Sequence, residues 1–151
     1  MSTSKNKGWI IAAVCLGVAS TPAWAADGIR ETAVQFAKGK SAATLKDRIK
    51  GDESVDYRLG AAAGQTMTVT LKPSNRSTYF NVMAPGEDSA IFIGSTEGNK
   101  FSGRLPKSGD YVVRVYLMRN AARRNETSSY SIEFKIAADV PGAAAAPAPR
   151  P

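Results

Sequence analysis

Residues 65–72 read Gln-Thr-Met-Thr-Val-Thr-Leu-Lys, with apolar and polar side chains in strict alternation. Successive side chains of a β-strand point to opposite faces, so Met67, Val69 and Leu71 would lie on one face and the threonines on the other. Residues 129–137 alternate in the same way. Both runs therefore predict strands with one buried and one wet face, as an antiparallel sheet requires.

Further short runs rich in strand-forming residues surround these two and are separated by clusters of Gly, Pro, Asn, Asp and Ser. They span residues 32–37, 43–50, 55–60, 78–84, 90–94, 100–105 and 110–118. Helical periodicity is almost absent, and the connections are short enough for hairpins. The predicted fold class is all-β, an antiparallel β-sandwich of about eight to nine short strands. Residues 119–126 are expected to form a loop or a single helical turn.

The N-terminus, 1–25, has the features of a signal peptide. Lys5 and Lys7 precede a short apolar run over 9–19, and Ala23-Trp24-Ala25 supplies the small-x-small pattern of a cleavage site. The apolar run is too short to span a bilayer comfortably, so we expect cleavage rather than membrane insertion. The expected location is the periplasm.

The C-terminus, 138–151, is rich in Ala and Pro and has no packing pattern. It is expected to be a disordered tail. The folded domain is therefore expected over 26–137.

The composition removes several kinds of chemistry. The chain has no histidine, and its one cysteine, Cys15, lies within the signal peptide. Thiol chemistry and Cys/His zinc sites are thus excluded from the mature protein. The acidic pairs Asp52-Glu53 and Glu87-Asp88 lie in turns, where solvated acids are common, and match no calcium-loop pattern. We expect no enzyme activity, no metal and no cofactor.

The net charge is +7 for the whole chain, and it is +5 once Lys5 and Lys7 are removed with the signal peptide. A basic protein of the cell envelope can meet anionic lipid, peptidoglycan or an acidic protein surface. The secretion signal argues against nucleic acid as the partner.

The stretch from Lys107 to Asn125 is the most informative for function. Ser108-Gly109 makes a tight turn into a strand, and the alternation there places Tyr111 on the apolar face, as a core tyrosine. The alternative is that Ser108 and Tyr111 present hydroxyls from an exposed loop. Arg119, Arg123 and Arg124 are either a solvated cluster or a site for carboxylates, which the planar arginine fork binds well.

Ser108-Gly109-Asp110-Tyr111 resembles the Ser-Gly-x-Tyr motif of the bacterial periplasmic lysozyme inhibitors. Residues 114–125 are similar to the segment that follows this motif in inhibitors of i-type and g-type lysozymes. The resemblance covers about Val34 to Ile136 and implies a β-sandwich.

The resemblance also implies a binding mode and a partner. The loop of Ser108, Gly109, Asp110 and Tyr111 would enter the lysozyme cleft, with Ser108 and Tyr111 bonded to the catalytic carboxylates. Arg119 and Arg123 would pair with acidic groups of the cleft. Because Tyr116-Leu117-Met118 looks closer to the i-type inhibitors, we expect an i-type target rather than a g-type one.

Two other functions stay open at this stage. A carbohydrate- or peptidoglycan-binding sandwich is suggested by a resemblance to pre-peptidase C-terminal modules, with Tyr79, Phe92 and Tyr116 as a possible sugar platform. An envelope structural or chaperone protein is the other alternative. A homodimer is a further hypothesis for the assembly of the chain.

Overall fold

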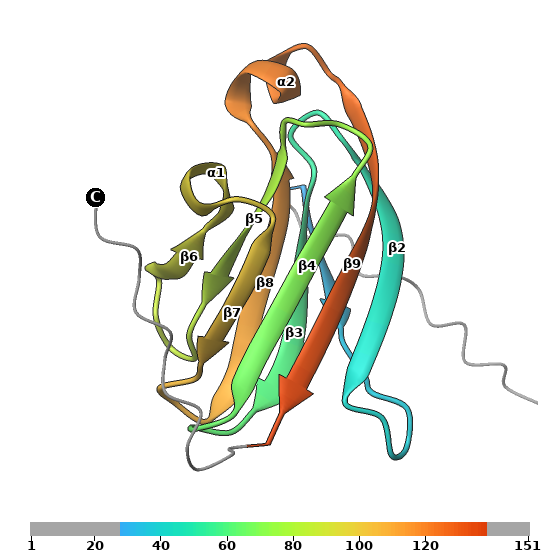
Figure 1. Ribbon diagram of the computed structural model, residues 1–151. Helices are drawn as coiled ribbons and strands as arrows, with labels where there is room; N and C mark the ends of the chain where they lie inside the picture. Colours follow the sequence, from blue (N-terminus) through green and yellow to red (C-terminus); the bar gives the residue numbers. More distant parts are fainter. Residues whose placement is uncertain (1–27, 139–151) are drawn as a thin grey trace, which may run out of the picture.

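The computed structural model of the chain describes residues 28–138, which form two packed layers of strands (Figure 1). The predicted signal peptide, and the predicted tail beyond Ala138, lie outside the described residues. The elements are, in order, β1 (Ile29–Ala33), β2 (Ala42–Lys50), β3 (Ser54–Ala61), β4 (Thr66–Pro73), β5 (Thr78–Met83), β6 (Ala90–Ile93), α1 (Gly94–Glu97), β7 (Lys100–Arg104), β8 (Gly109–Leu117), α2 (Arg119–Arg123) and β9 (Thr127–Ala137). No helix in the described range is long and apolar enough to cross a bilayer.

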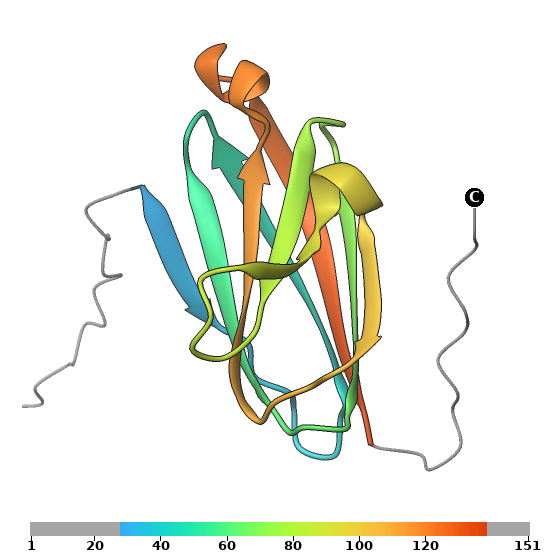
Figure 2. The same ribbon diagram turned by 90° about the vertical axis from the view of Figure 1, so that its left-hand side faces the viewer.

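The strands divide into two sheets, which Figure 2 shows edge-on. Sheet A has the order β1-β3-β8-β5-β6, and sheet B has the order β2-β9-β4-β7. The predicted all-β sandwich is thus confirmed, with nine strands in the described range. The predicted helical turn after β8 is present as α2.

The core lies between the sheets and is built from the alternating residues that the sequence indicates. Met67, Val69 and Leu71 of β4 are buried, and their threonine neighbours face solvent. The same alternation holds along β8 and β9. Their buried residues are Tyr111, Val113, Val115 and Leu117 of β8, and Tyr130, Ile132 and Phe134 of β9.

The first strand differs from its prediction in place and in direction. It covers Ile29–Ala33 rather than 32–37, and it runs parallel to β3. Val34 is buried and Phe36 packs against the core, so a connecting segment mimics the alternation of a strand. The parallel direction is possible because β2, which follows β1, belongs to the other sheet and no hairpin links β1 to β3.

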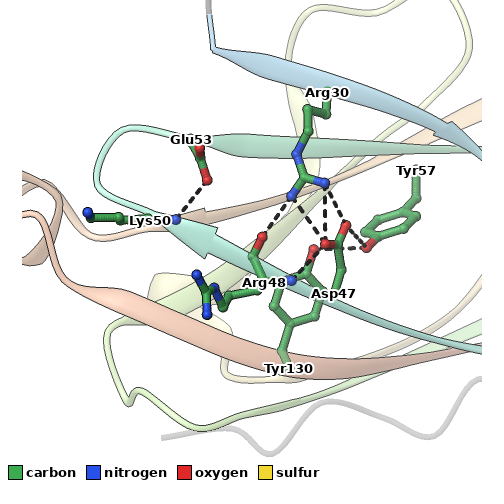
Figure 3. Close-up of polar contacts among 7 residues, drawn as sticks. All are labelled: Arg30, Asp47, Arg48, Lys50, Glu53, Tyr57 and Tyr130. Atoms are coloured by element: carbon green, nitrogen blue, oxygen red, sulfur yellow. Dashed lines mark hydrogen bonds and ion pairs between the residues drawn. The ribbon is translucent and has the colours of Figure 1, made fainter. Parts of the chain in front are cut away.

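A polar network joins the two sheets on the side where β1 and β2 lie (Figure 3). The Arg30 guanidinium donates to the Asp47 carboxylate at 3.2 and 3.3 Å and to the Arg48 carbonyl at 2.7 Å. The hydroxyls of Tyr57 and Tyr130 lie 2.8 Å apart, and Tyr57 also donates to Asp47 at 3.5 Å. Because each sheet supplies two or more members, the network fixes the sheets against each other as well as satisfying buried polar groups.

Burial affects the acidity of both phenols in this network. It raises the pKa of Tyr57 to about 12, although the bond from Tyr130 acts in the opposite direction. It also raises the pKa of Tyr130, and there the bond with Tyr57 adds to the shift. Both side chains are therefore held neutral far above neutral pH.

We predict that this network makes the protein sensitive to alkali. Below pH 10, the ordinary tyrosine value, both phenols are protonated in the folded and the unfolded chain and add no pH dependence. As the pH rises from 10 to about 12 the unfolded chain ionises first, so the free energy of unfolding falls. Urea unfolding followed by circular dichroism should show that the free energy of unfolding falls less with pH in Tyr57→Phe/Tyr130→Phe than in the wild type. If the free energy of unfolding of the double variant fell with pH as steeply as that of the wild type, the prediction would be contradicted. Tyr79→Phe, which lies outside the network, is the control.

Candidate functional site

Strand β8 separates the residues that the sequence suggests for binding. Ser108 precedes β8 and Arg119 follows it, and a strand of nine residues spans about 30 Å. In Figure 1 the β7–β8 connection and α2 lie at opposite ends of the sandwich. The fold therefore does not bring the two groups together on one edge: Ser108 and Tyr111 lie towards one end of the sandwich, and Arg119 and Arg123 lie at the other.

The Ser108 end is largely satisfied by its own hydrogen bonds. The Ser108 hydroxyl accepts from the Ala63 backbone N–H at 2.8 Å. Tyr111 is fully buried; its hydroxyl donates to the Lys107 carbonyl at 2.7 Å and accepts from the Lys107 N–H at 3.2 Å. This is the tyrosine-corner arrangement, in which a core tyrosine ties down the chain just before its own strand.

The alternation of β8 turns the Tyr111 ring into the core, so the core tyrosine predicted from that alternation is confirmed and the alternative of an exposed hydroxyl is wrong. Ser108 and Gly109 remain exposed. Gly109 has φ +138°, and a Cβ there would come 3.0 Å from Pro85, so the turn needs glycine.

The opposite end carries α2, whose two faces differ. Ala121 and Ala122 are buried against the sandwich, and the guanidiniums of Arg119 and Arg123 are exposed. Residues four apart are neighbours on a helix, so the two arginines share a face. Within residues 28–138 neither has an ion-pair partner. Arg124 differs, since its Nε donates to Glu126 at 2.7 Å.

The position of α2 is fixed by the β2–β3 turn and by the chain that leaves the helix. The Gly51 N–H donates to the Glu126 carbonyl at 2.9 Å, and the Asn125 N–H donates to the Ala122 carbonyl at 2.9 Å. Asn125 has the left-handed φ of 57°. The Glu126 carboxylate accepts from Asn75 at 2.8 Å, and this bond, followed by the bond from Arg124, lowers its pKa. The arginines therefore project from a braced element.

A hollow of about 470 Å³ lies below α2 on the outward face of sheet A. Tyr116, Met118 and Arg119 line one part of it, and Asp52 and Glu53 of the β2–β3 turn line another. Met118 is 40% exposed and is one of three large apolar side chains in the described range that are exposed to this extent. The α2 end thus offers cations, an apolar contact and a recess side by side.

Arg114, one of the residues that line this hollow, is held in an ion pair. Arg114 donates through Nε and Nη2 to both oxygens of Asp56, each at 2.7 Å. These bonds raise the pKa of Arg114, and Asp56 is itself buried. The pair is bidentate and rigid, so Arg114 is already committed within the protein.

The three aromatics proposed as a sugar platform do not lie together. Phe92 is buried and stacks on Phe80 with ring centroids 5.0 Å apart. Tyr79 and Tyr116 face each other across β5 and β8 and are half-buried, and the Tyr116 hydroxyl donates to Asn81 at 3.2 Å. Two of the three rings are therefore on the outward face of sheet A.

The chemistry available at the α2 end is recognition of carboxylates. Residues 28–138 hold no group of three or more His, Cys, Asp or Glu side chains placed to bind a metal. Sequence reasoning missed Gly51 and Met118, and it treated Asp52-Glu53 as a solvated turn. The Gly51-Asp52 turn and the exposed Met118 are visible in the sequence, but their closeness to α2 depends on the fold.

Comparison with curated proteins gives a relative of stated function. The chain is 33% identical over 106 residues to the inhibitor of g-type lysozyme of Escherichia coli strain K12, covering 68% of this chain and 78% of that protein. No family model matches the chain.

The chain is also similar to solved structures of other inhibitors of g-type lysozyme. The periplasmic inhibitor of g-type lysozyme from Aeromonas hydrophila has a TM-score of 0.68 and 40% identity, covering 72% of this chain and 97% of that one. The corresponding Salmonella Typhimurium inhibitor has a TM-score of 0.57 and 28% identity, with coverages of 71% and 97%. A pre-peptidase C-terminal domain of a Bacillus anthracis collagenase, with a TM-score of 0.50, 16% identity and coverages of 71% and 94%, shares the fold alone.

The comparisons do not support the expected preference for i-type lysozyme, since these inhibitors act on the g-type. That preference depended on Tyr116-Leu117-Met118. Leu117 is a core residue that the sandwich itself requires, so this tripeptide is a poor indicator of the target class.

We predict that Tyr111→Phe lowers the free energy of unfolding by about 1–2 kcal/mol, because it leaves the backbone N–H and carbonyl of Lys107 without their partner. Urea unfolding measures this change. Tyr116→Phe, which removes a hydroxyl on the outward face, should cost less. Equal losses in the two variants would mean that Tyr111 does not tie down the turn.

We also predict that Gly51→Ala destabilises the protein by about 1–3 kcal/mol. Gly51 has φ +59°, and an added Cβ would lie 2.5 Å from the Asn125 side chain. Gly39→Ala is the matched control, since Gly39 has φ +74° and nothing within 4 Å of the added Cβ. The difference in stability loss between Gly51→Ala and Gly39→Ala, from thermal unfolding, measures the contact of Gly51 with the α2 end. Equal losses in the two variants would refute that contact.

Proposed function

The chain belongs to the family of the periplasmic inhibitors of g-type lysozyme, and from this membership we propose that it binds a g-type lysozyme and blocks its active-site cleft with the α2 end. The periplasmic location expected from the sequence agrees with the descriptions of its relatives. The relatives are inhibitors rather than enzymes, in line with the expected lack of catalysis.

The observation that carries the proposal is the pair Arg119 and Arg123, exposed on one face of α2 without ion-pair partners in the described range. Glycoside hydrolases of this kind carry carboxylic acids in the cleft. A guanidinium matches a carboxylate in two parallel, charge-assisted bonds. Two neighbouring guanidiniums therefore suit a cleft that is rich in carboxylates.

The energetics of α2 favour the same function. Like charges four residues apart destabilise a helix by about 0.2–0.5 kcal/mol, and an acidic partner would turn this repulsion into attraction. Because the β2–β3 turn already braces α2, little conformational freedom is lost on binding. Met118 adds an apolar contact next to the cations.

The loop of Ser108 and Gly109 is the alternative contact, as the resemblance to the Ser-Gly-x-Tyr motif implies. Its exposed members are Ser108, Gly109 and Asp110, and the Ser108 hydroxyl already accepts one bond from the Ala63 N–H. The two ends are too far apart to fill one narrow cleft together, so mutations can distinguish them.

We expect the purified mature protein to inhibit g-type lysozyme selectively in cell-wall lysis assays run in parallel with c-type and i-type enzymes. Arg119→Gln/Arg123→Gln should raise the inhibition constant about tenfold or more, because it removes the cations that meet the carboxylates. Lys38→Gln/Lys40→Gln, in the β1–β2 connection, is the charge-matched control and should leave inhibition unchanged. Thermal unfolding checks that both variants fold.

Two results would argue against this proposal. Loss of inhibition in Ser108→Ala, with Arg119→Gln/Arg123→Gln unaffected, would move the contact to the other end of β8. Absence of inhibition of every lysozyme class at micromolar protein would remove the inhibitor function and favour a glycan-binding role.

A further inference from the structure

Within residues 28–138, the outward face of sheet B carries a cluster of basic side chains, most of them without an ion-pair partner. We call it the basic face and define it by Lys46, Arg48 and Lys50 of β2, Lys72 of β4, Lys100 of β7 and Lys135 of β9. All six side chains are exposed. Arg104 of β7 lies on the same face, and Glu133 is the only acidic residue on it within the described range.

The strand register shows that these residues form one surface. Ser131 of β9 faces Lys46 on one side and Lys72 on the other, which places two lysines in one row across three strands. The next row carries Glu133 opposite Thr70, and Thr70 opposite Lys100. Threonines and serines fill the positions between the cations. They are Thr44, Thr66, Thr68, Thr70, Ser102, Thr127, Ser129 and Ser131.

Few of these cations are neutralised within the protein. Lys135 pairs with Glu133 at 2.9 Å. Within residues 28–138, Lys46, Lys72 and Lys100 have no ion-pair partner, and the same holds for Arg48 and Lys50.

Sheet A has a different outward face, where charges are matched. Arg58 pairs with Glu31 at 2.8 Å, and Arg114 pairs with Asp56 at 2.7 Å. Of the two outward sheet faces, sheet B therefore carries the excess charge, and further cations unpaired in the described range, such as Lys38, Arg119 and Arg123, lie outside both faces.

We propose that the basic face docks on an anionic phospholipid surface. Basic side chains gathered on one sheet face, with hydroxyls between them, suit the layer of phosphate groups that a bilayer presents, and each cation near such a surface adds to the attraction. No aromatic side chain within the described range points outward from sheet B. The hollow below α2 includes no residue of this face, and neither does a second hollow, which Arg58, Glu87 and Asp110 line. Stacked rings and a recess are the usual requirements of a glycan site, so peptidoglycan is the less suitable partner.

Docking by this face would leave the α2 end uncovered. Figure 1 looks onto sheet B, with α2 beyond the ends of its strands rather than over them. The inhibitor would then lie flat on the membrane with its arginines directed sideways. This inference does not depend on the lysozyme proposal.

The test is co-sedimentation of the mature protein with vesicles of phosphatidylcholine containing 30% phosphatidylglycerol, about one lipid in three, and with pure phosphatidylcholine vesicles. We expect binding to the anionic vesicles alone, and its loss in about 0.5 M salt. Lys46→Gln/Arg48→Gln/Lys72→Gln should weaken binding about a hundredfold. Lys38→Gln/Lys40→Gln/Arg76→Gln removes the same charge outside the basic face and should bind almost as the wild type does.

Three results would overturn the proposal: equal losses in the two triple variants, equal binding to both kinds of vesicle, or binding to purified peptidoglycan sacculi without binding to anionic vesicles. The basic-face variant should still inhibit lysozyme, so the outcome is distinguishable from failure of the proposed function. Circular dichroism of both variants checks the fold.

Discussion

The burial of one face of β8 is the constraint on which the other features depend. Tyr111, Val113, Val115 and Leu117 pack into the core while β3 and β5 pair with the two edges of the strand. This packing sets the direction of the chain and places the Ser108 turn at one end and α2 at the other. It also takes the Tyr111 ring away from the surface. Any binding surface must therefore be built at the ends of the strand or on the outward faces, and the exposed arginines of α2 occupy one such end.

Charge is distributed unevenly over this scaffold. Cations on the outward face of sheet A are matched by Glu31 and Asp56, whereas those of the basic face and of α2 are mostly unmatched within the described residues. An ion pair formed within the protein would have to be broken and desolvated before an outside partner could use either member. Unmatched arginines and lysines avoid that cost. The two unmatched groups also lie on different parts of the surface, so they can contact different partners at the same time.

Much of the fold can be predicted because strict alternation has a direct meaning in a half-buried strand. The β4 run of Met67, Val69 and Leu71 shows this, and the core faces of β8 and β9 follow the same rule. The error at β1 arose because Val34 and Phe36 are buried from a connecting segment, and alternation alone does not separate the two cases. The arginine cluster can be found in the sequence. Its spatial separation from Ser108 cannot, because that separation appears only when residues 109–117 are known to form one extended strand. Contact between Gly51 and the α2 end joins segments about seventy residues apart, and no local pattern reports it.

The order of strands in the sheets has a consequence for how the protein reaches its folded state. The inner strand β8 of sheet A and the inner strand β9 of sheet B are the last two in the chain. Before they emerge from the export channel, the earlier segments can form only the pairs β1–β3, β5–β6 and β4–β7, and β2 has no neighbour. Neither sheet can be completed on a partial chain, so folding waits for release of nearly the whole polypeptide and then proceeds through long-range contacts. A chain cut short within β8 lacks β9 and part of β8, so it has neither sheet complete and no whole sandwich to adopt.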